Sequence, residues 1–451
     1  MTAAPDTAAL GRLGLARGAA GARSLWVRAA VAVAALAAMF ILLGTAAFAA
    51  RGALDVIGHE SGRQVVATAD LYLALSDADT QVATVLLLGR DAPVETGAAL
   101  REYAALRGDI AEYLLEANRL AGAAQTQRDT VESIMGYYGE YEQLAAEALL
   151  LADLADYPAG QVPEDVLAAY RDAADLMQGW ILPQAYNLTL ENGTIVRESH
   201  DDAQDAIGFG LAAVAATGAA ALLALGWLQL HLARAFRRLL NPSLLVATAV
   251  TALYLFTGLV VLDAERDALD EAKTDGFDTT MALKRAEAIS NSLHADQVRT
   301  LLDPARASVY EQTFLDKAQQ LLYVTGAGNL DDYRNGLGSA TDQGLIAAGT
   351  GGAADGDAVI ASYTALIDAD ADMRADTGAG AAERLRGVTG ALAAYEGDLA
   401  HLVGNRLDTF DDAVGEGEDA IADFAFLLPA AMVSLFVLTF SGLAPRLREF
   451  R

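Results

Sequence analysis

Four long runs of apolar residues divide the chain. Each run holds about 20 residues with almost no charge, and a helix of that length crosses a hydrocarbon core of roughly 30 Å. The runs cover residues 29–50, 207–230, 243–262 and 422–444. Buried core helices of a large soluble protein are the alternative interpretation, but four such runs favour four transmembrane helices.

The two long segments between these runs, residues 51–206 and 263–421, show the periodicity of packed helices. In the first, apolar residues recur at a heptad spacing, as at Val65, Tyr72 and Leu86, which is typical of a helix bundle. Helices are predicted at 96–122, 126–155 and 163–206. No segment shows the alternation of a strand. We therefore predict an all-α membrane protein in which each long segment forms an up-down four-helix bundle.

The order of the segments indicates a tandem duplication. A span, a bundle and a second span are followed by a short hairpin and then by the same elements again. Pro183 is expected to kink the last helix of the first bundle. Asp303 followed by Pro304 is expected to cap a helix in the second bundle. A glycine-rich stretch over residues 326–356 is expected to link helices there.

The distribution of charge predicts the orientation in the membrane. Three short segments, residues 1–28, 231–242 and 445–451, hold ten basic and two acidic side chains, out of 31 and 60 in the chain. Positively charged short segments stay in the cytoplasm. Both termini and the hairpin are therefore expected to face inward, and the two bundles outward. The hairpin arginines are candidates for contact with a cytoplasmic partner. They are Arg234, Arg237 and Arg238.

Composition narrows the classes of partner. The formal net charge is −29, and the excess of acidic side chains lies in the two long segments. Such a surface repels nucleic acid and small free anions and favours a protein with a basic face. The absence of cysteine excludes disulfides, a lipid-anchoring cysteine and thiolate metal sites. Small residues over 47–53 resemble a signal-peptide cleavage site, but the length of the first apolar run favours a retained span.

The ionisable residues supply few candidates for chemistry. The histidines share no metal-ligand spacing, and the acidic run at 368–372 lacks the glycine and the distal acid of a calcium loop. We therefore expect no catalytic residue, metal or cofactor. Asp79 stands in the row of Val65, Tyr72 and Leu86, where an apolar residue is expected. It either receives the ammonium group of a ligand, pairs with an arginine of the next helix, or belongs to a polar layer whose hydrogen bonds are satisfied. Asp296 and Arg299 lie one turn apart and either hold a zwitterion or form an ordinary surface pair.

The span–bundle–span architecture resembles the four-helix-bundle ectodomains of bacterial chemoreceptors and sensor kinases. Arginine far outnumbers lysine and alanine is abundant, which suggests GC-rich coding and an actinobacterial source. The stretches "ADLYLALSDADTQVATVLL", "LMQGWILPQAYNL" and "ADQVRTLLDPARASVYEQTF" are similar to the actinobacterial GlnX-like family of four-span membrane proteins. That resemblance implies a link between an extracellular amino-acid-binding lipoprotein and a cytoplasmic serine/threonine kinase, with aspartate, glutamate or a related amino acid as the ligand. It transfers no functional residue, and the glycine-rich stretch departs from the pattern.

These observations predict a non-enzymatic, multi-pass membrane sensor. Its expected partners are the bilayer, a solute-binding lipoprotein, a cytoplasmic kinase and a second copy of the chain. The cytoplasmic segments are too short for an effector domain of their own. The alternative is a permease-like subunit of an ABC-type exporter or cell-wall-hydrolase regulator, which usually has a single large external region. A passive envelope scaffold is a third interpretation.

Overall fold

The computed structural model describes residues 7–55, 62–121, 124–236, 241–339, 343–350, 354–376, 378 and 380–448. Every regular element within these ranges is a helix, which confirms the predicted all-α class. The chain divides into two compact units. We call them the span unit (Met1–Asp55, Ser199–Asp270 and Ala413–Arg451) and the bundle unit (Val56–Glu198 and Glu271–Asp412), each taken only as far as it is described.

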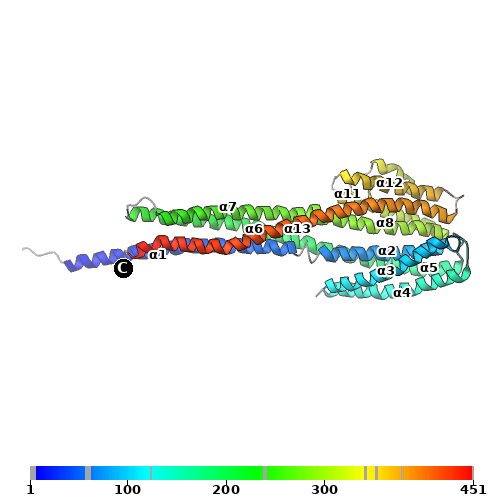
Figure 1. Ribbon diagram of the computed structural model, residues 1–451, viewed down its shortest axis with the longest axis horizontal. Helices are drawn as coiled ribbons and strands as arrows, with labels where there is room; N and C mark the ends of the chain where they lie inside the picture. The colour runs from blue at the N-terminus through cyan, green and yellow to red at the C-terminus, as the bar shows by residue number, and fades with distance from the viewer. Residues whose placement is uncertain are drawn as a thin grey trace, which may run out of the picture. The chain divides into compact units, whose positions relative to one another are not determined.

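The bundle unit has two halves, Val56–Glu198 and Glu271–Asp412, as far as they are described. The first half consists of helices joined by short turns (Figure 1). Gly89 permits the turn after the first of them, because its φ is +52° and a Cβ there would lie 2.4 Å from the carbonyl oxygen of Tyr157. The elements are α2 (Gly62–Leu88), α3 (Pro93–Leu120), α4 (Gln125–Ala155), α5 (Glu164–Leu176), the π-helix η2 (Met177–Ile181) and α6 (Leu182–Phe236). The helices predicted at 96–122, 126–155 and 163–206 are present, with the last divided by η2.

The interruption expected at Pro183 takes the form of this π-helix. Proline has no N–H to donate to the carbonyl group four residues earlier, and its ring crowds that carbonyl. The preceding turn is wider than an α-helical turn, and the N–H of Leu182 donates to the carbonyl of Met177. The chain then continues as one helix, α6, through the end of the bundle unit to Phe236.

The second half begins with another π-helix and ends in the longest helix of the described chain. In its described part, the glycine-rich stretch over 326–356 contains two short α-helices and a 3-10 helix as well as links. The elements are η3 (Ala272–Asp278), α8 (Thr279–Leu302), the 3-10 helix η4 (Pro304–Arg306), α9 (Ala307–Leu321), α10 (Leu330–Gly336), the 3-10 helix η5 (Leu337–Ser339), α11 (Leu345–Thr350), α12 (Ala354–Ala375) and α13 (Ala381–Arg448).

Asp303 ends α8 and is the N-cap residue of η4, in which Pro304 is the first residue, as predicted. Its carboxylate also accepts from Nε and Nη2 of Arg171 in α5, at 2.7 and 2.8 Å. A residue read from the sequence as a local signal therefore makes a long-range contact.

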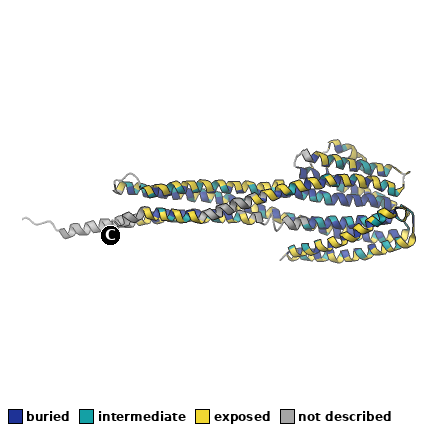
Figure 2. Ribbon diagram, viewed as in Figure 1, coloured by how far each residue is buried: buried dark blue, intermediate teal, exposed yellow. Residues whose placement is uncertain are grey.

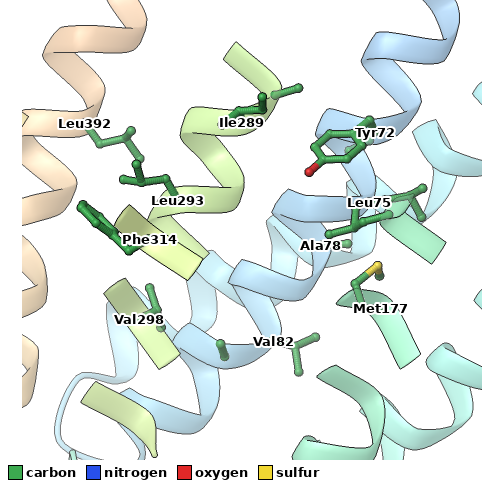
Figure 3. Close-up of a cluster of buried hydrophobic side chains, with 14 of the residues drawn as sticks. Tyr72, Leu75, Ala78, Val82, Met177, Ile289, Leu293, Val298, Phe314 and Leu392 are labelled. Carbon is green, nitrogen blue, oxygen red and sulfur yellow. The ribbon is translucent and has the colours of Figure 1, made fainter. Parts of the chain in front are cut away.

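The two halves of the bundle unit share one hydrophobic core. In α2, Tyr72, Leu75 and Val82 belong to the same buried cluster as Ile289 and Leu293 of α8 (Figure 3). Both helices are buried along most of their length, and they pack against each other at the centre of the unit (Figure 2). The regions 51–206 and 263–421, which we expected to form two bundles, are thus joined in one compact body.

Four described helices contain stretches long and apolar enough to cross a membrane, which supports a location there. Three of these helical segments contain a span predicted from the sequence. The segments are Trp26–Ala49, Glu164–Arg234 and Pro242–Leu302. The fourth is Ala67–Leu88 in α2, which is apolar because neighbouring helices cover most of its surface. The predicted span 422–444 lies in α13, and its side chains are described only in part, with an apolar stretch at Pro429–Ser441.

The span unit packs through small and apolar side chains. It contains α1 (Thr7–Asp55), α7 (Pro242–Glu271) up to Asp270, and the parts of α6 and α13 that belong to it. Gly258 lies close to Leu43, and its missing side chain leaves the room that the leucine fills. Such contacts are usual between apolar helices that approach closely.

The shared core predicts that the two halves of the bundle unit unfold together. Leu293→Ala should lower the free energy of unfolding by about 2–5 kcal/mol, because it leaves a cavity against both halves. Hydrogen exchange of the full chain should then accelerate in α4 and in α12 alike. Leu154→Ala, at an exposed position of α4, is the control and should change little. Faster exchange confined to α12 would show that the halves fold separately.

Candidate functional site

A buried arginine joins the two halves of the bundle unit. Arg299 of α8 is 1% exposed, and its Nη2 donates to the carboxylate of Asp79 in α2, which is fully buried. The Nε atom donates to the hydroxyl of Tyr170 in α5 at 3.2 Å. Tyr141 of α4 donates its hydroxyl to Asp79 Oδ1 at 3.1 Å. Side chains from α2, α4, α5 and α8 thus meet at a single ion pair.

A second ion pair continues the network into the second half. Arg299 Nη1 donates to Asp296 Oδ1 at 2.7 Å, and Lys317 Nζ of α9 donates to Asp296 Oδ2 at 2.6 Å. Thr313 adds a hydroxyl at 3.0 Å from the same oxygen. Two carboxylates therefore face one guanidinium and one ammonium, so the buried charges cancel. We call these four residues, Asp79, Asp296, Arg299 and Lys317, the buried ion network.

Burial and charge act in opposite directions on these groups. Desolvation disfavours the charged form of Arg299, but Asp79, Tyr170 and Asp296 outweigh it, so the pKa of the guanidinium is raised well above its usual value. Desolvation lowers the pKa of the Lys317 ammonium, and Asp296 opposes this only in part. Burial, followed by the charge of Asp79, raises the pKa of the Tyr170 hydroxyl. Tyr170 is therefore held neutral beside a permanent cation.

A separate set of polar contacts joins α8 to α12. Gln297 of α8 donates to Asp370 Oδ1 of α12 at 3.0 Å, and Arg374 donates its Nε to Asp370 Oδ2 at 2.7 Å. His294 lies 2.9 Å from the side-chain oxygen of Gln297. Helix α8 thus contacts α2, in the first half, through Arg299 and α12, in the second, through Gln297.

Further ion pairs flank the network between the two halves. Their exposure is greater, so each stabilises less than the buried pair. Besides Arg171–Asp303, they are Asp70–Lys284 at 3.3 Å, Asp175–Arg306 at 3.0 Å and Glu95–Arg386 at 3.4 Å. In these three the acid lies in the first half and the base in the second. The charge pattern therefore favours association of one half with the other.

The structure brings together the three candidates identified in the bundles. Asp79 does pair with an arginine, but the arginine comes from α8 and not from the next helix of its own half. Asp296 and Arg299 do pair, but they are buried and not on the surface. Their charges are matched by one another, by Asp79 and by Lys317. The arrangement is therefore an enclosed connection between helices.

Of the three hairpin arginines, Arg234 alone lies among the described residues. Arg234 lies exposed in the last turn of α6. Arg237 and Arg238 lie outside the described residues. Lys317 and the two buried tyrosines were missed by the sequence analysis. The rarity of lysine was the available signal, since Lys317 is one of only three in the chain.

Residues 53–201 match the family model described as an actinobacterial sensor domain. The match covers the first half of the bundle unit with three residues on either side of it, and it ends before the apolar run that begins at residue 207. It supports a sensing role and an actinobacterial source. No curated protein and no solved structure matches the chain. Asp79, Tyr141 and Tyr170 lie inside the matched segment, whereas Arg299 lies outside it.

The buried ion network predicts a large penalty when one partner is removed. Arg299→Met should lower the free energy of unfolding by about 3–5 kcal/mol, because Asp79 loses its counter-charge inside the core. Adding Asp79→Asn to that variant removes the unpaired charge and should restore about 1–3 kcal/mol. Chemical unfolding of the full chain in detergent measures both values.

A matched control comes from the exposed pair of Arg334 and Asp368. Arg334→Met should change the free energy of unfolding far less than Arg299→Met does, because water surrounds both side chains of this pair. An Arg299→Met variant as stable as Arg334→Met would show that the buried ion network does not hold the halves together. A double variant less stable than the single variant would show that Asp79 has another stabilising role.

Proposed function

We propose that this chain is a non-enzymatic membrane sensor whose bundle unit lies outside the cell. In this proposal, an amino-acid-binding lipoprotein engages the bundle unit, and a cytoplasmic serine/threonine kinase receives the signal at the termini and the basic hairpin. The match of residues 53–201 to an actinobacterial sensor domain supports the sensing role. The net charge of −29 supports docking of a partner with a basic face.

The observation that carries the proposal is the buried contact between Asp79 and Arg299. It ties the half that matches the sensor domain to the half that ends in α13. Both α6 and α13 are single helices that extend from the bundle unit into apolar stretches of the span unit. A partner that changes how α2 packs on α8 therefore shifts helices that continue into the spans. A signal of this kind needs no catalytic residue in the chain.

The proposed orientation can be tested directly, because the chain contains no cysteine. Single cysteines are introduced at Glu140, which is exposed on α4, and at Arg234, which is exposed at the end of α6. A membrane-impermeant maleimide should label Glu140→Cys in intact cells, and Arg234→Cys only after the cells are permeabilised. The reverse pattern would overturn the orientation and the placement of both partners.

The partners are tested by purifying the tagged full chain from its native host. A solute-binding lipoprotein and a serine/threonine kinase should copurify. A triple variant, R234A/R237A/R238A, should lose the kinase and retain the lipoprotein, because the change is confined to the hairpin. Arg334→Ala, at an exposed position in the bundle unit, is the control and should retain both. Recovery of an ATPase would support the permease-like alternative, and recovery of no partner would support a passive scaffold.

A further inference from the structure

A groove between the two halves of the bundle unit has the composition of a small-molecule site. Its volume is about 760 Å³, which lies within the usual range for ligand pockets. Helices α2 and α3 supply one side, and η3, α8 and α13 supply the other. Most of its surface is apolar. The main apolar side chains that line it are Tyr113, Leu115, Phe277, Met281, Leu407 and Phe410.

One polar group in the wall of the groove lacks a partner. Thr280 of α8 is 4% exposed, and its hydroxyl makes no hydrogen bond to any described residue. The neighbouring Thr279 donates its hydroxyl to the carbonyl of Gly276 in η3, at 3.0 Å. A buried hydroxyl without a partner costs free energy, and native structures usually satisfy such groups. Thr280 lines the groove, but neighbouring atoms cover its hydroxyl oxygen. It offers a hydrogen bond to a molecule in the groove once those atoms shift.

The rim of the groove is negatively charged. The lining residues include the carboxylates of Asp70, Glu112, Glu116 and Asp411 and the guanidinium of Arg119. Arg119 donates to Glu116 at 2.7 Å, and Lys284 pairs with Asp70 at 3.3 Å. Glu112 and Asp411 are exposed on opposite walls, on α3 and α13. An anionic ligand is repelled at this rim, whereas a cationic group is attracted.

The groove also lies beside a close contact between η3 and α13. A Cβ on Gly276 would lie 2.8 Å from Cδ2 of Phe410 and 3.2 Å from its Cα. Phe277 and Phe410, on either side of this contact, both line the groove. A molecule that displaces the Phe410 ring therefore acts on α13, and α13 continues into the span unit.

We propose that this groove binds a small cationic amphiphile. The ligand has an apolar body that fills the groove, a neutral polar atom that hydrogen-bonds to Thr280, and an amino group that lies near Glu112 and Asp411. Only the effect on signalling rests on the proposed function; the binding itself does not. This site takes a small molecule directly, in contrast to the lipoprotein proposed above.

The test uses three compounds of similar size as probes. Tyramine carries both a phenol and an ammonium group, phenethylamine lacks the phenol hydroxyl, and 3-(4-hydroxyphenyl)propionate replaces the ammonium with a carboxylate. Each is titrated calorimetrically into the full chain in zwitterionic-lipid nanodiscs, with empty nanodiscs as the blank. Tyramine should bind at least about tenfold more tightly than the propionate and about 3- to 10-fold more tightly than phenethylamine.

Two variants and a control locate the binding. Ala111 is exposed on α3 and lines the groove, so Ala111→Trp should fill the groove and abolish binding without disturbing the core. Ala104 is exposed on the same helix but does not line the groove, so Ala104→Trp should bind as the unchanged chain does. Thr280→Val keeps the shape and should make tyramine and phenethylamine bind equally.

Three results would overturn the proposal. They are binding of no probe at millimolar concentration, preference for the propionate, and unchanged binding in Ala111→Trp. The measurement uses the purified chain without a lipoprotein or a kinase. A failure of the partner experiments therefore leaves the binding result intact, and absence of binding leaves the partner proposal intact.

Discussion

A guanidinium buried between two carboxylates imposes a strict geometry on the bundle unit. Removing an ion from water costs several kcal/mol, and this cost is offset only when its partners stand in the correct positions. Arg299 meets this requirement through Asp79 on α2 and Asp296 on its own helix. If α8 slides or rotates against α2, the contact to Asp79 is lost while that to Asp296 remains. We infer that the network specifies one register between the halves.

The buried ion network joins the part of the chain that matches the sensor-domain model to a part that lies outside the match. The family match ends at residue 201, and the second half has a different set of short helices in its glycine-rich stretch. The two halves nevertheless share a core, a balanced set of buried charges and the walls of one groove. The two halves therefore form one body to which each contributes different elements.

Local sequence patterns predicted the helices well. The periodicity of apolar residues, the positions of prolines and the length of apolar runs each report on a single helix, so they can be read without knowing its neighbours. Helices appear where the sequence predicted them, and the interruption near Pro183 appears one turn earlier, as a π-helix. Asp79 was recognised as unusual because it replaces an apolar residue on a packing row. Its partner lies 220 residues away, so no local pattern identifies Arg299. The groove escaped prediction for the same reason, since its walls come from five separate elements.

The π-helix η3 sets the rotation of everything that follows it. A π-helical turn accommodates an additional residue within a helix, and one residue corresponds to about 100° around an α-helix. η3 runs directly into α8, the helix that carries Thr280, Asp296 and Arg299. If a deletion converted η3 to an ordinary α-helical turn, the inward face of α8 would be turned to one side. The π-helix therefore determines which side of α8 faces α2.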